Sequence, residues 1–162
     1  MTEEVLGATA EERLAALGLE LPTPPVPIAS YVPFTYAGEL IVTSGVLPVQ
    51  DGRLVQGRLG ADVTVEEGAH AARAAALSLL ALLAASAGRL ERIQGLLLLT
   101  GYVRSAPDFA RQSEVIDGAS KLLVDVLGES GRHARVAIGV AELPRGACLE
   151  LQLIARRQEE PA

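Results

Sequence analysis

The chain has 162 residues, of which 49% are hydrophobic and 21% are charged, and its formal net charge is -6. This length and apolar content predict one domain with a substantial core. The negative charge argues against a broad nucleic-acid surface, because phosphate binding requires clustered lysine and arginine side chains. The single cysteine, Cys148, cannot form an internal disulfide, so we expect a reducing, cytoplasmic location.

The first thirty residues are expected to form a leader. They are acidic at their start and lack the basic, then apolar pattern of a signal peptide. Thr9 and Glu12 have the spacing of a capping box, which predicts a short helix over residues 9–18. Four closely spaced prolines then favour an extended segment. The expected parts are a leader (residues 1–30), a main domain (residues 31–157) and a tail (residues 158–162).

A strand pattern begins after the prolines. Residues 31–45 predict a hairpin that turns near Gly38, and a second turn at residues 50–52 leads into a short strand or extended connection. Three further strands are expected over residues 93–105, 135–140 and 147–156. We expect the last two strands to be joined by a turn.

A long helix is expected between the second turn and the next strand. Thr64 precedes Glu66 and Glu67, and acidic residues suit the positive N-terminal end of a helix. The helix should run to about Ala87. Its most apolar stretch, residues 74–88, is shorter than the ~20 residues that cross a membrane. We therefore expect a buried helix and no membrane association.

A second long helix is expected to start at residues 107–108. Its apolar face should consist of Phe109, Ile116, Leu123 and Val126, which recur at helical spacing. The order of strands and helices predicts an α+β fold, in which a mixed sheet is packed on one face by two long helices.

Two charged residues interrupt the apolar strands near the C-terminus. Arg135 begins one strand and Glu150 lies inside the next. If these strands pair directly, alternation places both charges on one face, with small residues such as Ala137 between them. The pattern by itself favours an ordinary solvent-exposed face. The alternative is a cleft in which a guanidinium binds a carboxylate and a carboxylate orients water.

Other chemistries have little support in the sequence. His70 and His133 belong to no metal-binding motif, so no metal site is predicted, and no nucleotide-binding motif occurs. Ser44 lacks the motif of a hydrolase nucleophile, and we interpret Ser44-Gly45 as a strand end with a backbone donor. Cys148 is interpreted as a small buried residue rather than a reactive thiol.

Three segments resemble the Rid family of reactive-intermediate deaminases, also called YjgF or L-PSP, for which endoribonuclease and translation inhibitor are older names. They are ELIVTSGVLPV at residues 39–49, DFA at 108–110 and RVAIGVAELPRGACLELQLIA at 135–155. The similarity spans about residues 31–157, and DGAS at 117–120 is typical of a divergent branch. The resemblance implies a chorismate-mutase-like α+β domain that assembles as a homotrimer with clefts between subunits.

The resemblance also implies roles for particular residues. Arg135 corresponds to the arginine that binds the substrate carboxylate, a task suited to a bidentate guanidinium. Glu150 corresponds to the glutamate that helps to hold the attacking water. These two are the expected catalytic residues. The expected substrate-binding residues are Tyr31, Ser44, Gly45, Asp117, Arg135 and Ala137.

The implied reaction is hydrolysis of a 2-imino acid, or its enamine tautomer, to a 2-keto acid and ammonia. A protonated imine carbon is already electrophilic, so the protein mainly positions substrate and water, and no cofactor is expected. The expected partners are a small carboxylate-bearing imine or keto acid and further copies of the chain. A non-catalytic carboxylate-binding or sensor protein is the first alternative, and ribonuclease activity ranks last.

Overall fold

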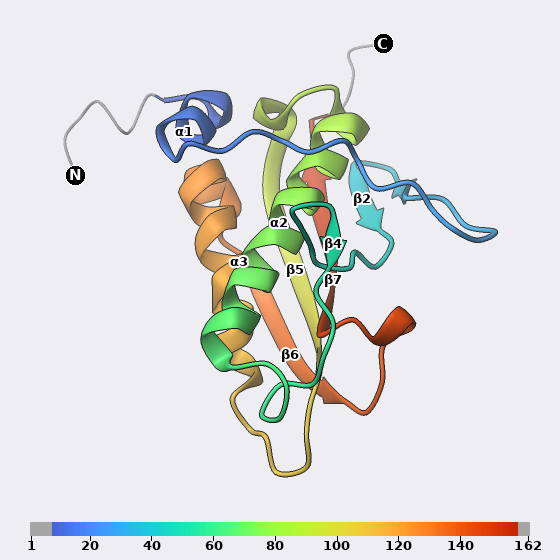
Figure 1. Cartoon of the computed structure of the whole chain (residues 1–162). Helices are drawn as coiled ribbons and strands as arrows, with labels where there is room; N and C mark the ends of the chain where they lie inside the picture. The colour runs from blue at the N-terminus through green and yellow to red at the C-terminus, as the bar shows by residue number, and fades with distance from the viewer. Residues whose placement is uncertain (1–7, 159–162) are drawn as a thin grey trace.

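The main sheet has five strands. They are β1 (Phe34–Ala37), β2 (Leu40–Thr43), β5 (Ile93–Arg104), β6 (Ala134–Val140) and β7 (Leu149–Arg157). Their order across the sheet is β1-β2-β7-β5-β6, and only β5 and β6 run parallel. A separate hairpin consists of β3 (Val49–Gln50) and β4 (Arg53–Leu54). The computed structural model describes residues 8–158, and helices α2 (Val65–Ala87) and α3 (Gln112–Leu127) cover one face of the main sheet (Figure 1). The predicted α+β fold is confirmed.

The leader begins with the short helix α1 (Ala10–Ala16). The predicted capping box is present: the Thr9 backbone N–H donates to Glu12 at 2.7 Å, and the Glu12 N–H donates to Thr9 Oγ1 at 3.1 Å. Leu14 is buried in the core, and α1 packs against α3. After α1 the chain runs without helix or strand to β1 (Figure 1). The division of the chain at residue 31 stays a prediction, and most of the predicted tail lies outside the described residues.

The helix α2 is buried, as its composition predicts. A capping box between Thr64 and Glu67 fixes its start, and the hydrogen bond from the Thr64 backbone lowers the pKa of Glu67. By length and composition α2 could cross a membrane, but more than half of its most apolar window is buried inside the fold. It packs against both α3 and β7, with Leu79 and Leu83 fully buried.

The helix α3 begins later than the sequence predicts. Asp108 adopts a left-handed backbone conformation (φ 65°), so residues 107–108 form a turn rather than a first helical turn. Phe109 precedes the helix and packs over Gly60. The other three predicted face residues, Ile116, Leu123 and Val126, are fully buried.

A glycine sets the approach between the two long helices. A Cβ at Gly118 would lie 2.0 Å from the carbonyl oxygen of Ala69. Only the missing side chain therefore lets α3 approach the backbone of α2 this closely. This contact fixes the helical turn that carries Asp117 and Ser120.

The predicted pairing of the last two strands is wrong. β5 lies between β6 and β7, pairing parallel with β6 and antiparallel with β7. Two features explain this arrangement. The helix α3 is long enough to return the chain from β5 to a parallel β6. The connection from β6 to β7 contains a 3₁₀ turn (Pro144–Gly146) rather than a two-residue hairpin turn.

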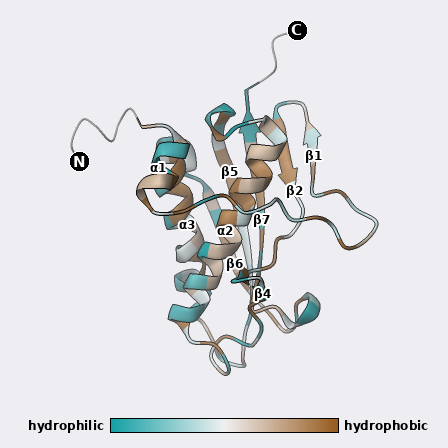
Figure 2. Cartoon of the chain, turned by 45° about the horizontal axis from the view of Figure 1, so that its top comes forward, coloured by the Kyte–Doolittle hydropathy of each residue, from teal (hydrophilic) through white to brown (hydrophobic). Residues whose placement is uncertain are grey.

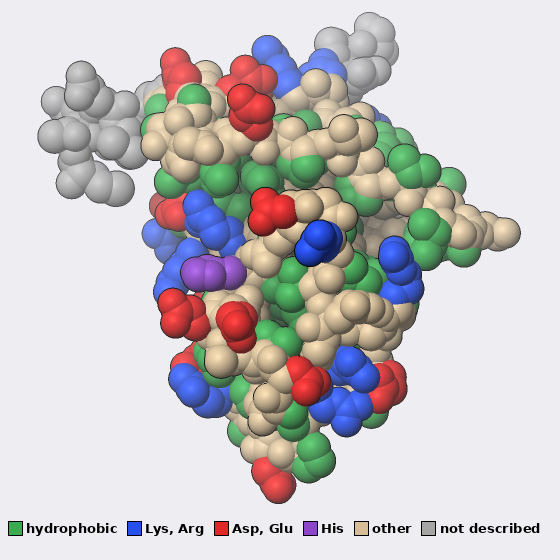
Figure 3. Space-filling view, in the orientation of Figure 1, with side chains coloured by type: hydrophobic (Ala, Val, Ile, Leu, Met, Phe, Trp, Pro, Cys, Tyr) green, Lys and Arg blue, Asp and Glu red, His purple; other side chains and the backbone are tan. Residues whose placement is uncertain are grey.

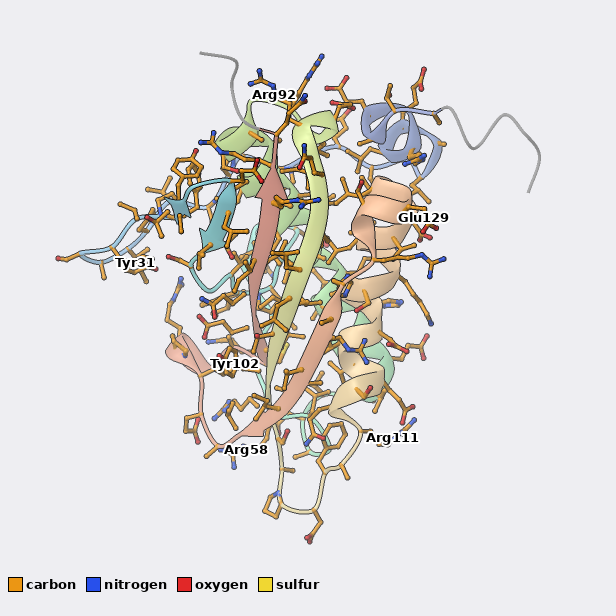
Figure 4. All side chains as sticks on the ribbon, turned by 180° about the vertical axis from the view of Figure 1, so that it is seen from behind. Tyr31, Arg58, Arg92, Tyr102, Arg111 and Glu129 are labelled. Atoms are coloured by element: carbon orange, nitrogen blue, oxygen red, sulfur yellow. The ribbon has the colours of Figure 1, made fainter. Side chains whose placement is uncertain are left out.

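Within the described part of the chain, helices pack on only one of the two faces of the sheet. Leu149, Leu151 and Leu153 share the face that points toward the helices, and they are fully buried. The opposite face carries Val136 and Ile138, which remain 45% and 40% exposed. Figure 4 views the molecule from this uncovered side, and Figure 2 shows hydrophobic colouring along β2 and much of β5. We call this uncovered side the open face.

Candidate functional site

Arg135 lies on the helix side of the edge strand β6. In the sheet register it is aligned with Leu99 of β5, which is itself aligned with Leu153 of β7. Its guanidinium reaches α3: Nη1 donates to Asp117 Oδ1 at 2.6 Å and to Ser120 Oγ at 3.1 Å. The other amino group, Nη2, donates to Oγ and to the carbonyl of Ser113, at 2.6 and 3.3 Å.

A histidine extends this network. Nδ1 of His133 lies 2.6 Å from the carbonyl oxygen of Gly131, and Nε2 lies 2.9 Å from Ser120 Oγ. A carbonyl can only accept, so Nδ1 carries the hydrogen; in the neutral ring Nε2 then accepts from the hydroxyl of Ser120. Asp117, Ser120 and Arg135 line a shallow pocket of about 400 Å³ together with His133.

Glu150 lies on the open face, in register with Tyr102 and, beyond it, Ile138. Its carboxylate lies directly over Gly45, where a Cβ would be 1.8 Å from Oε1. Burial raises the pKa of Glu150 above its ordinary value. Within residues 8–158 its carboxylate has no hydrogen-bond partner, so this proton-binding group is available to a ligand or water.

The hydroxyl of Ser44 is hydrogen-bonded to a backbone carbonyl rather than to another side chain. It donates to the carbonyl of Val32 at 2.6 Å, and the Ser44 backbone N–H donates to the carbonyl of Pro33 at 2.9 Å. These bonds hold the segment that carries Tyr31, whose side chain is 49% exposed. Figure 4 shows Tyr31 on the loop beyond the β1–β2 edge of the sheet.

The predicted site residues therefore form two groups. The arginine group contains Asp117 and Arg135, with Ala137 on the same helix-facing side of β6. The glutamate group contains Gly45 and Glu150, next to Ser44. The prediction that Arg135 and Glu150 share a face is wrong. It assumed that β6 and β7 pair directly, whereas the observed register through β5 places the two side chains on opposite faces.

Three polar residues of the arginine group were not predicted as site residues: Ser113, Ser120 and His133. Ser113, Asp117 and Ser120 are spaced four and three residues apart, which places them on one face of a helix. That spacing is visible in the sequence and could have indicated a polar stripe on α3. The contact of His133 with Ser120 depends on the turn that precedes β6, so it could not be predicted from the periodicity of the sequence.

Cys148 is fully buried, and burial raises the pKa of its thiol to about 11. The thiol is therefore protonated at neutral pH. The interpretation of Cys148 as a small buried residue is confirmed.

Comparisons with known proteins identify the family. The sequence model of the family described as "YjgF/chorismate mutase-like, putative endoribonuclease" matches residues 11–156. Protein TCP17 of Trypanosoma cruzi is 42% identical over 155 residues, covering 92% of this chain and 97% of that protein. A crystal structure titled a "putative endoribonuclease" from Shewanella oneidensis is 37% identical with a TM-score of 0.89, covering 92% of this chain and 99% of that one.

A more distant solved structure was determined with a ligand. The structure of TdcF from E. coli with bound serine is 25% identical, with a TM-score of 0.60, and covers 83% of this chain and 94% of that one. The matches over nearly the whole described chain establish the class. This chain belongs to the YjgF/chorismate-mutase-like family.

Proposed function

We propose that this chain hydrolyses small 2-imino acids, or their enamine tautomers, to 2-keto acids and ammonia. One observation carries the proposal: the Glu150 carboxyl lies over Gly45 without a hydrogen-bond partner in the described chain, and its pKa is raised by burial. A carboxyl group whose pKa is shifted toward neutrality is suited to exchanging a proton with water. Family membership is consistent with a hydrolase-like function.

The proposed reaction needs one water molecule and one proton carrier. Glu150 orients a water molecule and takes its proton as the oxygen attacks the protonated imine carbon, which forms a carbinolamine. The same carboxyl returns the proton to nitrogen. The carbon–nitrogen bond then breaks, the hydroxyl proton passes to the departing ammonia, and keto acid and ammonium leave. Positioning of substrate and water accounts for most of the required catalysis.

The substrate carboxylate is assigned to Arg135. Because Arg135 and Glu150 lie on opposite faces of one sheet, we propose that a complete cleft combines the arginine group of one copy with the glutamate group of another. The exposed Val136 and Ile138 on the open face support association between copies, since burying them removes apolar surface from water. A homotrimer with clefts between subunits is the proposed assembly.

Two further observations support a small polar ligand rather than RNA. TdcF, a structural relative, was solved with bound serine. The chain has a net charge of -6, and on the face drawn in Figure 3 acidic and basic side chains are interspersed rather than gathered into one basic patch. RNA binding depends on concentrated positive charge.

The test is an assay of imine hydrolysis. An amino acid oxidase generates the imino acid in situ, and keto acid formation is compared with the uncatalysed rate in buffer. Wild type is expected to accelerate hydrolysis, and Glu150→Gln to reduce that acceleration about a hundredfold, as for loss of a general acid–base group. Glu114→Gln is the matched control, because Glu114 is an exposed carboxylate paired with Arg111, which does not line the pocket of Arg135.

Other outcomes separate the alternatives. A wild-type rate equal to that in buffer rejects the proposed activity for the imine used. Thermal stabilisation by 2-ketobutyrate without turnover would instead indicate a carboxylate-binding protein. RNA cleavage that survives further purification and is lost in Glu150→Gln would indicate ribonuclease activity.

A further inference from the structure

The charge of Arg135 is compensated before any ligand binds. Its two terminal nitrogens make four hydrogen bonds to α3, and one of these is an ion pair with Asp117 at 2.6 Å. These bonds use all four terminal N–H groups, so a ligand carboxylate must bind at Nε–H or displace a serine contact, and it meets a guanidinium that already has an acidic partner. The pocket presents the cation of Arg135 and the anion of Asp117 side by side, and its second guanidinium, Arg132, is paired with Glu129.

Asp117 keeps one oxygen for a ligand. Only Oδ1 contacts Arg135, and Oδ2 has no hydrogen-bond partner in the described chain. The Asp117 side chain is 48% exposed, whereas that of Arg135 is 21% exposed. Both residues line the same pocket of about 400 Å³. Asp117 also lines a neighbouring pocket with Glu114 and Lys121, and we take its free oxygen as the acceptor for a positively charged group bound next to Arg135.

This arrangement distinguishes ligands by their charge pattern. A simple carboxylate gains the attraction of Arg135 but is repelled by Asp117, and a simple amine experiences the reverse. A zwitterion whose carboxylate and protonated nitrogen are attached to the same carbon can contact both residues. Each of its charges then lies next to the opposite charge of the protein. We propose that the Arg135–Asp117 pair selects such zwitterions over simple carboxylates, with Asp117 as the specificity-determining residue.

This inference deepens the proposed function and rests on it, because a protonated 2-imino acid is a zwitterion of this kind. Its carboxylate would bind Arg135 and its iminium N–H would donate to Asp117. The released keto acid has lost the nitrogen and is a simple carboxylate. The same pair would therefore bind the product more weakly than the substrate.

A conservative variant isolates the role of Asp117. In Asp117→Asn the amide oxygen can still accept from Arg135 Nη1, and Ser113 and Ser120 still hold the guanidinium. The negative charge is lost, and the free oxygen Oδ2 is replaced by an amide NH2 group, which donates and cannot accept from a ligand N–H. The matched control is Glu114→Gln, which removes one carboxylate charge from the same helix, where Glu114 pairs with Arg111 rather than Arg135.

Binding is measured by calorimetry with L-alanine as the zwitterion, propionate as the simple carboxylate and ethylamine as the simple amine. Wild type and Glu114→Gln are expected to bind alanine more tightly than propionate. In Asp117→Asn this preference should fall about fivefold, the upper range for one exposed ion pair. Equal preferences in wild type and Asp117→Asn, or no binding of alanine by wild type, would overturn the proposal.

The catalytic proposal is tested separately. If wild type discriminates alanine from propionate through Asp117 but does not accelerate imine hydrolysis, the proposed function fails and the charge selection stands. If wild type hydrolyses imines and Asp117→Asn leaves the ligand preference unchanged, the proposed function stands and the role of Asp117 is rejected.

Discussion

The Glu150 carboxylate occupies the space that a side chain at Gly45 would fill, since a Cβ there would lie 1.8 Å from Oε1. The observed position of the Glu150 carboxylate therefore requires a glycine at position 45. Gly45→Ala is expected to displace Glu150 and to reduce imine hydrolysis nearly as far as Glu150→Gln does. Stability should change little, because the clashing group is the end of a flexible side chain. Steady-state kinetics with a thermal melt checks this, and full activity of Gly45→Ala would contradict it.

Gly118→Ala should destabilise the fold, because the new Cβ would meet the backbone carbonyl of Ala69 at 2.0 Å. Overpacking of this kind costs about 1–3 kcal/mol of stability. Alanine also favours the helix over glycine by about 1 kcal/mol, so the net effect is destabilising only if the new Cβ forces the two helices apart. We expect them to separate, with a fall in melting temperature of about 2–4 °C per kcal/mol lost. Gly95→Ala, where no atom lies within 4 Å, is the control.

Glu150 makes stability depend on pH. Its pKa is raised in the folded protein, so its contribution is fully present below the ordinary pKa of a glutamate and is lost as the carboxyl deprotonates at higher pH. Glu150→Gln should therefore melt higher than wild type near neutral pH, because a neutral amide avoids the cost of burying a charge. The difference in melting temperature between Glu150→Gln and wild type should disappear under acidic conditions. A constant difference across the pH range, or the same behaviour in Glu129→Gln, would exclude this cause.

Cys148 should resist thiol reagents in the native protein. With a pKa of about 11 and full burial, it has little thiolate and no access near pH 8. A colourimetric thiol assay is expected to detect no fast reaction in buffer and one thiol per chain after denaturation. Rapid labelling of the folded protein would show that the strand region around Cys148 opens readily.

The open face provides a test of assembly. Ile138→Glu places a charge among exposed apolar residues of β6 and is expected to dissociate any oligomer formed through that face. Light scattering on a sizing column measures the mass. Leu17→Glu changes a comparably exposed apolar residue on the leader and should leave the mass unchanged. An unchanged mass in Ile138→Glu would place the association elsewhere.

Local sequence patterns predicted most of the helices and strands, but they did not predict which strands pair in the sheet. The capping residues Thr9 and Thr64 marked two helix starts, and the apolar composition of residues 74–88 predicted the burial of α2. The start of α3 was missed because a left-handed aspartate forms a turn where periodicity suggested a helix.

The choice of candidate site residues stays a prediction, and the structure corrects how they are arranged. Resemblance singled out Arg135 and Glu150, whereas their relative orientation depends on β5 lying between the two strands. Strand order arises from long-range packing, which a pattern of neighbouring residues does not contain. The ion pair of Arg135 with Asp117 likewise depends on how α3 docks on β6.

The two groups of site residues differ in how the chain builds them. Asp117, Ser120 and Arg135 belong to a single continuous unit, β5–α3–β6. Gly45 and Glu150 meet only because β2, from the first third of the chain, pairs with the last strand. Under the proposed function, substitutions on α3 would alter which ligand charges are accepted without disturbing the carboxyl group assigned to proton transfer. Ligand choice and proton transfer would then lie on separate parts of the fold, so each could vary in evolution while the other is kept.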